Sequence, residues 1–394
     1  MDTLKKAKWK IGSLNEIAEV TMGQSPPGSS YNNSQNGVGL INGPTEFTSK
    51  YPVVKQWTTQ PTKLCKTGDI LLCVRGSSTG RMNISNGEYC IGRGVASISG
   101  KEKKGITEFV YYLLEYKISQ LLKMTAGSTF PNLSSNEIKD MVISIPNLEE
   151  QQKIAKILST WDKAIELKEK LIEQKKEQKK GLMQKLLTGE VRLPGFEGEW
   201  KLKKLKSLCS KIMDGTHTTP KYTETGIPFY SVENVTRRDF TNHKYISEEE
   251  HLSISSRCKV EKGDILMTRI GSIGDAILVD WDHESSIYVS LALIKTNKTI
   301  LSEYLVQYMG THEFKKDILS KSLLSAVPQK INLVDIGNVN VYFPQDISEQ
   351  KAIVDILSNG DKEIYLLEKE LESLKQQKKG LMQLLLTGKV RVKA

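Results

Sequence analysis

The chain has 394 residues, 38% of them hydrophobic and 26% charged, which is the composition of a globular protein. This length exceeds what one ordinary core accommodates and predicts two domains of about 150 residues each, with further segments between them. No apolar run approaches the roughly 20 residues that cross a bilayer, and the N-terminal stretch MDTLKKAKWKIGSL lacks the apolar core of a signal peptide. We therefore expect a cytoplasmic protein with no membrane partner.

Charge and cysteine usage narrow the possible partners and sites. The chain carries 56 basic and 46 acidic residues, a net charge of +10, which indicates a polyanionic partner such as DNA, RNA or an acidic protein. The five cysteines are scattered, without a C-x-x-C pair or histidines at ligand spacing, and predict no metal site. We expect them to be reduced in the cytoplasm.

Residues 1–147 have the pattern of a first globular domain. It opens with an amphipathic segment from Trp9 and continues with a loop rich in Gly, Pro, Ser and Asn at residues 23–33. In KTGDILLCVRGSSTGR (66–81), Gly-Asp predicts a turn, Ile-Leu-Leu a short buried strand, and Gly76 and Gly80 a second tight loop. A helix is expected near 107–123 and an apolar strand before Pro146, so strands dominate the domain.

Residues 148–192 predict a single long helix. They follow Pro146, are rich in Glu, Lys, Gln and Leu, and end in GLMQKLLTGEVR, where Thr-Gly at 188–189 is a helix stop. At about 1.5 Å per residue, a segment of about 40 residues makes a helix about 60 Å long.

Residues 193–344 repeat the pattern of the first domain, and residues 345–394 repeat the long helix. The second domain opens at Trp200, has a polar loop at 214–226, and carries EKGDILMTRIGSIGDA (261–276), the counterpart of residues 66–81, with a helix expected near 302–319. The helix match is closer, because residues 149–192 align with 348–391 at a constant offset of 199 positions. The chain is therefore an internal duplication with the order domain, long helix, domain, long helix.

Both long helices carry apolar residues at heptad spacing. We assign the following residues to the seam of a two-stranded coiled coil and to partner docking: Leu158, Trp161, Ile165, Ile172, Leu182, Leu186, Leu357, Ile364, Leu367, Leu371, Leu374, Leu381 and Leu385. Lys168 and Lys175 interrupt the first seam, but their long side chains can extend from it toward solvent. Helix two starts from the domain at which helix one ends, so the helices pair antiparallel. The predicted fold class is α+β, with two globular mixed α/β domains joined by two long antiparallel helices that form a pseudo-two-fold symmetric coiled coil.

The motifs of common enzymes are missing from the sequence. It has no G-x-x-x-x-G-K-[ST] loop, no strand-associated G-x-G-x-x-G for a dinucleotide or S-adenosylmethionine, and no G-x-S-x-G elbow. All five histidines (His217, His243, His251, His283 and His312) lie in the second domain, which favours ordinary surface or core histidines over a duplicated catalytic role. The acidic stretch GDAILVDWDHE suggests a nuclease, but its counterpart GRMNISNGEYC lacks the carboxylates. We therefore expect no catalytic residue in this chain.

The residues at the helix junctions resemble those of a known family. PNLSSNEIKDMVISIPNLEEQQKIAKIL and KKGLMQKLLTG, with the related sequences further along the chain, resemble the DNA-specificity subunit of Type I restriction-modification systems. The most specific parts are I-x-x-P followed by E-Q-x-x-I at the helix entry and L-M-Q-x-L-L-T-G at the helix exit. The second entry, YFPQDISEQ, departs from the usual pattern, and Gly360 stands where the first helix has Trp161, which affects local helix packing.

The resemblance implies that residues 1–147 and 193–344 are target-recognition domains, each reading one half of a bipartite site on double-stranded DNA. The helices at 148–192 and 345–394 would set the gap between half-sites and dock two modification subunits, which bind S-adenosylmethionine and methylate adenine. Two ATP-driven restriction subunits with nuclease activity would complete the complex. This chain itself would hold no cofactor, and S-adenosylmethionine, ATP and Mg would be bound by its partners. A spacer of about 60 Å predicts half-sites between one and two DNA turns apart, at about 34 to 36 Å per turn.

Residue type and loop position select candidate DNA contacts, because phosphates bind Lys, Arg, Ser, Thr or amides, and base edges bind Arg, Asn, Gln, Asp or Glu. In the first domain they are Ser29, Tyr31, Asn32, Asn33, Gln35, Asn42, Arg75, Ser77, Arg81, Arg93 and Asn132. In the second domain they are Thr216, His217, Thr218, Lys221, Tyr222, Glu233, Asn234, Arg237, Arg238, Arg269, Ser272, Gln329 and Lys330. For each residue the alternative is an ordinary loop or turn position. Asp69 and Asp264 of the Gly-Asp-Ile-Leu segments are expected to close turns instead of facing DNA.

Two competing functions stay open from the sequence. A stand-alone site-specific nuclease or methyltransferase would bind S-adenosylmethionine or cut DNA by itself. A coiled-coil scaffold without a DNA role would show no steep salt dependence of DNA binding. The favoured hypothesis is a non-catalytic specificity subunit that positions partner enzymes on an asymmetric bipartite target.

Overall fold

The computed structural model describes residues 9–124 and 132–392. The chain divides into two compact units, the first comprising Met1–Glu169 and Lys369–Ala394 and the second Lys170–Glu368. Two helices of 40 residues each, α3 (Leu148–Leu187) and α9 (Ile347–Leu386), contribute one part to each unit. Each unit is therefore built around its own segments of both long helices.

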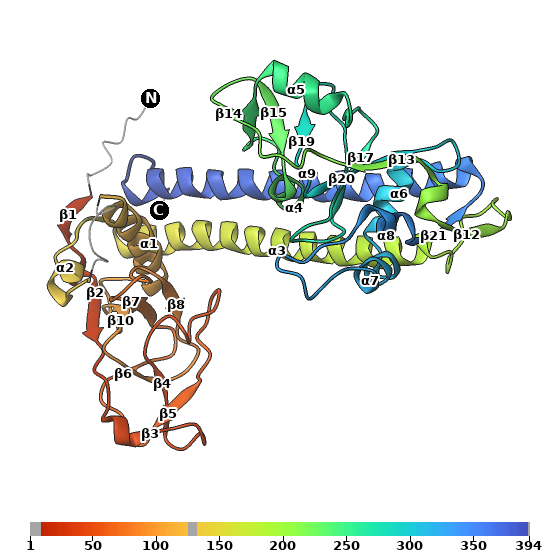
Figure 1. The fold of residues 1–394 in the computed structure, drawn as a ribbon. Coiled ribbons are helices and arrows are strands. Elements are labelled where there is room, and N and C mark those ends of the chain that lie inside the picture. The colour runs from red at the N-terminus through yellow and green to blue at the C-terminus, as the bar shows by residue number, and fades with distance from the viewer. Residues whose placement is uncertain (1–8, 125–131, 393–394) are drawn as a thin grey trace. The chain divides into compact units, whose positions relative to one another are not determined.

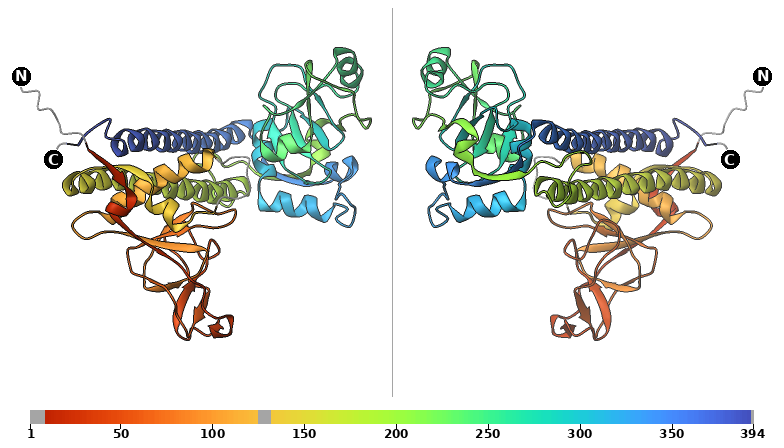
Figure 2. Two further views of the ribbon diagram at one scale, coloured as in Figure 1. Left: turned by 90° about the vertical axis from the view of Figure 1, so that its left-hand side faces the viewer. Right: turned by 90° about the vertical axis from the view of Figure 1, so that its right-hand side faces the viewer.

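The first unit contains three sheets and two shorter helices in its described part. In chain order these elements are β1 (Lys10–Ser13), β2 (Ala18–Met22), β3 (Tyr31–Asn32), β4 (Val38–Ile41), β5 (Gln56–Thr58), β6 (Leu64–Cys65), β7 (Ile70–Cys73), β8 (Met82–Ile84), β9 (Tyr89–Ile91), β10 (Val95–Gly100), α1 (Thr107–Met124), α2 (Ser135–Lys139) and β11 (Val142–Ile145). The sheet orders are β2-β10-β7-β8, β3-β5-β4-β9-β6 and the ribbon β1-β11. Both larger sheets lie to one side of this unit's long-helix segments, with the five-stranded sheet farther away (Figures 1 and 2).

The second unit repeats this plan. Its elements are β12 (Trp200–Lys204), β13 (Cys209–Asp214), β14 (Tyr222–Thr223), β15 (Ile227–Tyr230), α4 (Val232–Arg237), β16 (Lys244–Ile246), α5 (Glu248–Ser255), β17 (Ile265–Thr268), β18 (Ala276–Leu278), β19 (Ser286–Ile287), β20 (Leu291–Thr296), α6 (Ser302–Met309), α7 (His312–Ser320), α8 (Leu333–Gly337) and β21 (Asn340–Pro344). The sheet orders are β13-β20-β17-β18, β14-β16-β15-β19 and the ribbon β12-β21. The sheet β13-β20-β17-β18 has the same strand order as the sheet β2-β10-β7-β8 of the first unit. The predicted duplication and the α+β class are therefore confirmed.

The Gly-Asp-Ile-Leu segments form buried strands behind tight turns, as predicted. Every residue of β7 and of β17 is buried. The Asp69 carboxylate accepts the amide of Lys66 at 2.8 Å, and the Asp264 carboxylate accepts the amide of Glu261 at 2.8 Å. Both aspartates therefore close turns, and Gly68 and Gly263 supply the positive φ of 89° that each turn needs.

One predicted helix is divided in the structure. The segment expected to be helical near 302–319 forms α6 and α7, separated at Gly310 and Thr311. The hydroxyl of Thr311 accepts the amide of Phe314 and starts α7 as an N-cap. The sequence did not reveal this interruption, because the apolar residues keep almost the same helical spacing on both sides of the Thr cap.

Segments of α3 and α9 run antiparallel in each unit, as ion pairs between them show (Figure 1). In the first unit Lys378 lies 2.7 Å from Asp162, and Lys168, whose side chain is 23% exposed, lies 2.7 Å from Glu370. In the second unit Lys175 lies 2.7 Å from Glu363. The seam lysines therefore extend to flanking carboxylates, as expected from their length.

The two long helices pair with each other as the heptad spacing predicted. The prediction that the same residues also dock partner proteins was wrong at several positions. Six of the assigned residues are buried within the chain and offer no surface to a partner: Leu158, Ile172, Leu186, Leu357, Ile364 and Leu385. Six others are half-buried: Trp161, Ile165, Leu367, Leu371, Leu374 and Leu381. Leu182 is 38% exposed and lies outside the seam, because this end of α3 instead turns Met183, Leu186 and Leu187 toward the core of the second unit.

A buried glutamate near the start of α3 ties the first unit together. The Glu150 carboxylate accepts the indole N–H of Trp9 at 3.0 Å and two N–H groups of Arg391, each at 2.8 Å. The Arg391 guanidinium lies 5.1 Å from the Trp9 ring centroid, a cation–π distance. Gly388 has φ 71°, and a Cβ there would lie 3.0 Å from Trp9. The N-terminal ribbon, the start of α3 and the segment after α9 thus meet at one carboxylate.

The second unit contains the same arrangement 199 residues later in the helices. Glu349, at the start of α9, accepts the indole N–H of Trp200 at 3.2 Å and two N–H groups of Arg192 at 2.7 and 2.8 Å. The end of each long helix is therefore bound to the start of the other by an Arg–Glu–Trp contact, which accounts for the repeated T-G-x-V-R sequence.

A buried glutamine next to each glutamate orders the neighbouring loop. The amide of Gln151 donates to the carbonyls of Lys104 and Pro146 and accepts the backbone N–H of Ile106 at 2.9 Å. Gln350 makes the same three bonds in the second unit. Both side chains thereby satisfy backbone groups where the ribbon meets the long helix.

Replacing Glu150 with alanine should destabilise the chain far more than replacing its neighbour Glu149. Glu150→Ala leaves Arg391 and the Trp9 N–H without their buried acceptor, at a cost of about 3 kcal/mol. Glu149 is exposed and pairs with Lys153 at the surface, so Glu149→Ala should cost about 0.5 kcal/mol or less. Urea unfolding of the full chain, followed by helical circular dichroism, measures both. Equal losses in the two variants would contradict the role given to Glu150.

Candidate nucleic-acid interface

The described residues offer little support for an enzyme active site. Within residues 9–124 and 132–392, no three metal-ligating side chains come together. Among the helices that the structure describes, none is long and apolar enough to cross a membrane. Burial raises the pKa of Cys73 and Cys258 to about 11 and that of Cys209 to about 12, so these thiols stay protonated near neutral pH.

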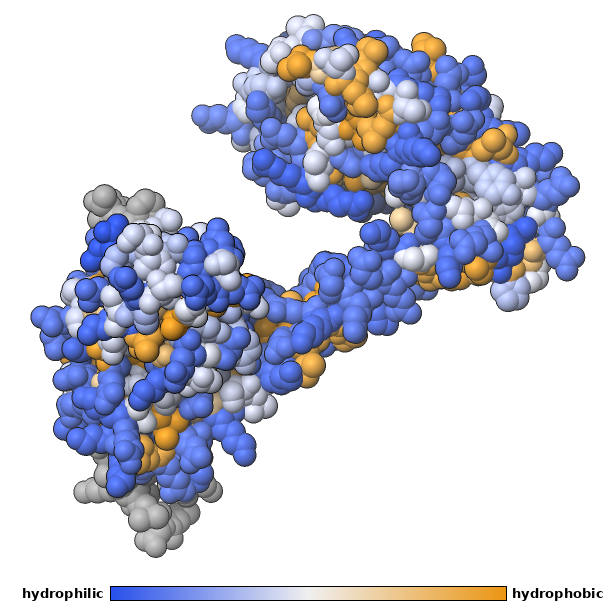
Figure 3. Space-filling model, turned by 90° about the horizontal axis from the view of Figure 1, so that it is seen from below, coloured by the Kyte–Doolittle hydropathy of each residue, from blue (hydrophilic) through white to orange (hydrophobic). Residues whose placement is uncertain are grey.

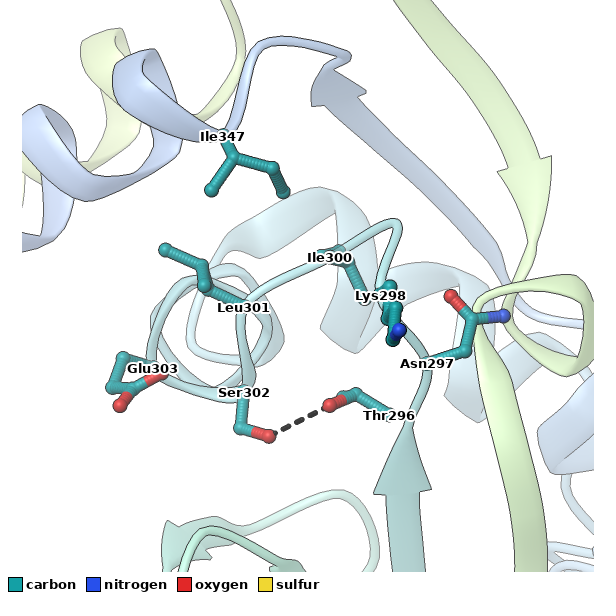
Figure 4. Close-up of a pocket in the computed structure, with 8 residues that line it drawn as sticks. All are labelled: Thr296, Asn297, Lys298, Ile300, Leu301, Ser302, Glu303 and Ile347. Atoms are coloured by element: carbon teal, nitrogen blue, oxygen red, sulfur yellow. Dashed lines mark hydrogen bonds between the residues drawn. The ribbon is translucent and has the colours of Figure 1, made fainter.

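A surface pocket of about 460 Å³ lies in the second unit beside the start of α9. Figure 4 shows its lining, which includes the apolar side chains of Ile300, Leu301 and Ile347 and a Thr296–Ser302 hydroxyl pair 2.9 Å apart. Its charged members are Lys298 and Glu303. This lining contains neither a nucleophile with an adjacent base nor a phosphate-binding glycine loop, and it suggests no chemistry.

The strongest polar cluster of the second unit surrounds Asp214, at the end of β13. Asp214 is 4% exposed, and its carboxylate accepts N–H groups from Arg269 at 2.8 Å, Arg257 at 3.2 Å and His217 at 2.9 Å. Arg269 is buried, whereas the side chains of Arg257 and His217 are 54% and 67% exposed. The buried pair is thus surrounded by two outward-facing cationic or hydrogen-bonding groups. Such groups, held in fixed positions, suit a polyanionic ligand.

Arg269 also joins three loops into one surface. Its guanidinium donates to the carbonyls of Val289 at 3.0 Å and Ile331 at 3.2 Å. The next residues form the glycine loop 270–275, where the amide of Gly271 donates to the carbonyl of Gln329 at 2.8 Å. Residues 323–330, which we call the apex hairpin, are closed by an antiparallel bridge between Leu323 and Lys330. Loop 214–219, the glycine loop and the apex hairpin therefore lie together.

The first unit has the same backbone arrangement with different side chains. Met22 pairs with Ala96 as Asp214 pairs with Ala292 in the second unit. Val74 accepts the amide of Leu133 as Arg269 accepts that of Ile331. An apolar Met22–Val74 combination therefore occupies the positions of the Asp214–Arg269 ion pair.

The sequence-based candidates of the first unit divide into exposed and turn-forming residues. The exposed ones are Ser29, Asn33, Gln35, Arg75, Ser77, Arg81, Arg93 and Asn132. Arg93 and Asn132 come close to the predicted loops, because the amide of Arg93 donates to Ser25 at 3.2 Å and Leu133 bonds to Val74, next to Arg75. Tyr31, Asn32 and Asn42 are half-buried. The Asn32 side-chain oxygen accepts the amide of Asn36 at 3.0 Å, so this residue builds a turn.

In the second unit the structure brings together Thr216, His217, Thr218, Ser272, Gln329 and Lys330 around the Arg269 framework. The remaining exposed candidates lie elsewhere in the unit, in β14, in α4 and in the adjoining loops: Lys221, Tyr222, Glu233, Arg237 and Arg238. Two candidates are corrected. Arg269 is buried with its guanidinium bonded within the protein, and Asn234 is buried with its amide bonded to Asp239, Asn242 and Ser231. Both residues support the surrounding loops through these bonds.

Three of the other four histidines make structural contacts. His251 is buried and bonds Ser286 at 2.9 Å, His283 bonds the Tyr230 hydroxyl at 2.9 Å, and His243 bonds the carbonyl of Phe240 at 2.8 Å. Among the described histidines, His217 combines high exposure with a buried carboxylate partner.

The sequence profile of the Type I restriction modification DNA specificity domain matches this chain twice, at residues 6–176 and 197–376. The chain belongs to this family. Each match contains one globular region and most of the long helix that follows it, in agreement with the duplicated fold.

Named relatives agree with this assignment, and solved structures share the fold. The chain is 37% identical over 187 residues to the putative Type I restriction enzyme MjaX specificity subunit of Methanocaldococcus jannaschii, a match that spans 47% of this chain and 44% of that relative. It is 30% identical over 343 residues to the MjaVIII specificity subunit of the same organism, covering 82% of this chain and 80% of the relative. The S subunit of M. genitalium has the same fold, with a TM-score of 0.56, 17% identity and 98% coverage of both chains. A chain from a structure of Type I restriction-modification complex assembly matches with a TM-score of 0.66 and 18% identity over 98% of this chain and 99% of that chain.

Two features of this surface were not identified from the sequence. Arg257 follows α5 in an unremarkable stretch, and only the fold places it on Asp214. Val327 is 99% exposed in the apex hairpin, although a valine followed by proline reads as a buried or extended position. The signal in the sequence is the lysine-flanked setting of this apolar residue in SKSLLSAVPQK.

The Asp214–Arg269 pair should be replaceable only as a pair. Arg269→Val should cost about 3 kcal/mol, because it leaves a buried carboxylate without its main partner. The double variant Asp214→Met with Arg269→Val copies the first unit and should recover stability to within about 1 kcal/mol of the parent chain. Denaturant unfolding of the full chain tests this double-mutant cycle. Additive losses would show that the two units do not share equivalent positions here.

Proposed function

We propose that this chain is the DNA-specificity subunit of a Type I restriction-modification complex and that it carries out no chemistry itself. Each globular region reads one half of an asymmetric bipartite target on double-stranded DNA. The long helices set the gap between half-sites and dock two modification subunits. In this proposal the subunit acts in the cytoplasm, in defence against foreign DNA.

The observation that carries this proposal is the contrast between a duplicated framework and divergent loops. Glu150 and Glu349 make equivalent contacts, whereas Met22 and Val74 correspond to Asp214 and Arg269 under the same backbone register. A common framework suits a shared partner bound twice. Different loops suit two different DNA sequences, since base edges are read by particular side chains.

Exposed apolar side chains on the long helices support docking of partners. Leu167 and Leu366 occupy equivalent positions, 199 residues apart, and are 53% and 50% exposed. The face of the long helices visible in Figure 3 is mostly hydrophilic with small hydrophobic patches. We assign partner docking to such exposed residues in place of the buried seam leucines, because two equal contacts suit two copies of one protein.

The chemistry belongs to the partners in this proposal. The modification subunits bind S-adenosylmethionine and methylate adenine, and two restriction subunits supply ATP-driven translocation and Mg-dependent cleavage. A stand-alone nuclease or methyltransferase has no observation in its favour among the described residues. A scaffold without a DNA role leaves the exposed Arg257–His217 cluster unexplained.

Mapping N6-methyladenine tests the proposal directly. The chain is expressed with its modification subunit in a host that lacks adenine methylation, and methylated positions are read by sequencing. The expected result is one asymmetric motif made of two short half-sites around a gap of constant length and free sequence. The control omits the specificity chain and should give no methylation. A continuous palindrome, or methylation without this chain, would rule the proposal out.

Changing the length of both long helices should change only the gap. Four added residues lengthen a helix by about 6 Å, which should widen the gap by about one or two base pairs. The insertion belongs in the lysine- and glutamine-rich stretch at 175–180 and in its counterpart at 374–379. The same sequencing measures the motif, and a changed half-site would contradict the spacer role of the helices.

A further inference from the structure

The apex hairpin, residues 323–330, presents apolar side chains to solvent where an isolated loop would be expected to be polar. Val327 is 99% exposed, Leu324 is 49% exposed and Leu323 is 45% exposed. Exposing so much apolar surface has a free-energy cost in the absence of a ligand. These side chains are therefore candidates for a contact made on binding.

The hairpin is held in place at its base. The amide of Leu323 donates to Lys330 at 2.8 Å, the amide of Gly271 donates to Gln329 at 2.8 Å, and that of Ile331 donates to Arg269 at 2.9 Å. Arg269 is itself fixed by Asp214. The exposed tip is thus supported by the same framework that orients Arg257 and His217.

The polar groups near the tip are suited to nucleic acid. Gln329 and Lys330 are exposed on the returning side of the hairpin, and Ser325 is exposed between the apolar residues. Hydroxyl, amide and ammonium groups bind phosphates and base edges. No acidic residue lies within residues 321–331, so the hairpin itself does not repel a polyanion.

Groove dimensions decide where the hairpin fits. At its base, Leu323 and Lys330 pair through an antiparallel bridge, so the two chain segments lie about 5 Å apart there before side chains are added. The major groove of DNA is about 12 Å wide and admits a two-stranded ribbon, whereas the minor groove is about 6 Å wide. The hairpin therefore fits the major groove. The one apolar group exposed on base edges there is the 5-methyl group of thymine.

We propose that the apex hairpin enters the major groove of the half-site read by the second unit and that Val327 contacts a thymine 5-methyl group. This assignment rests on the proposed function and adds a specificity-determining residue to it. The side chain contributes base selection through an apolar contact, while Gln329 and Lys330 contact neighbouring polar groups.

The test combines one protein change with single-methyl changes in DNA. It uses the assembled complex of this chain with its modification subunits and duplexes that carry the motif mapped by methylation sequencing. Each thymine of the motif is replaced in turn by deoxyuridine, which removes only the methyl group. At one thymine of one half-site, binding to the parent complex should weaken about fourfold, the effect of losing one buried methyl contact. Val327→Ser should weaken binding to the unmodified duplex by a similar factor and abolish the response to that deoxyuridine.

Matched controls separate this contact from a general effect. Val334→Ser changes a valine that is 74% exposed in α8 of the same unit, and it should leave both affinities unchanged. Deoxyuridine in the gap should have no effect. Assembly with the modification subunits, measured by size-exclusion chromatography, should be the same for Val327→Ser and the parent chain.

Three outcomes would overturn the inference. They are an absence of any thymine whose methyl group matters, an equal deoxyuridine response in the Val327→Ser and parent complexes, and a loss of subunit assembly in Val327→Ser, which would indicate a protein contact. Each of these leaves the bipartite motif in place. Failure of the proposed function itself would appear earlier, as the absence of such a motif.

Discussion

The contact on which the rest of the structure depends is a buried carboxylate at the start of each long helix. Glu150 and Glu349 each bind a tryptophan N–H from the opening ribbon of a unit and an arginine from the end of the other helix. A buried carboxylate without such donors would be costly, so the three chain segments are kept together by electrostatic necessity. Gln151 and Gln350 then connect the same junctions to the loops that precede α1 and α6.

The sheets use this fixed junction to support loops of different chemistry. The four-stranded sheets have the same order and equivalent registers, yet they place Met22 and Val74 in one unit where Asp214 and Arg269 stand in the other. The apolar pair needs no further partner. The ionic pair in addition holds Arg257 and His217 at the surface, and so two differences in the interior change which groups are presented outside.

Much of the architecture follows from local sequence. The Thr-Gly helix stops, the Gly-Asp turns and the antiparallel helix pairing rest on short-range rules of capping, turn geometry and heptad spacing, and the structure agrees with them. The docking role of Leu158 and Leu385 was wrong because heptad spacing identifies an apolar stripe without saying what covers it. Arg269 and Asn234 were misjudged for a related reason. Residue type and loop position do not reveal burial, which depends on contacts between segments far apart in the chain, as between Asp214 and Arg269.

The division of the long helices between units also bears on how the chain acquires its structure during synthesis. The second unit is one continuous stretch, Lys170–Glu368, whereas the first unit combines Met1–Glu169 with Lys369–Ala394. Met382, Leu385 and Leu386 belong to the core of the first unit, and Arg391 supplies the partner of Glu150. Domains commonly fold as units from the N-terminus as the ribosome proceeds. Here the first unit cannot complete its core until the last turns of α9 have been synthesised, whereas all residues of the second unit have been made by then.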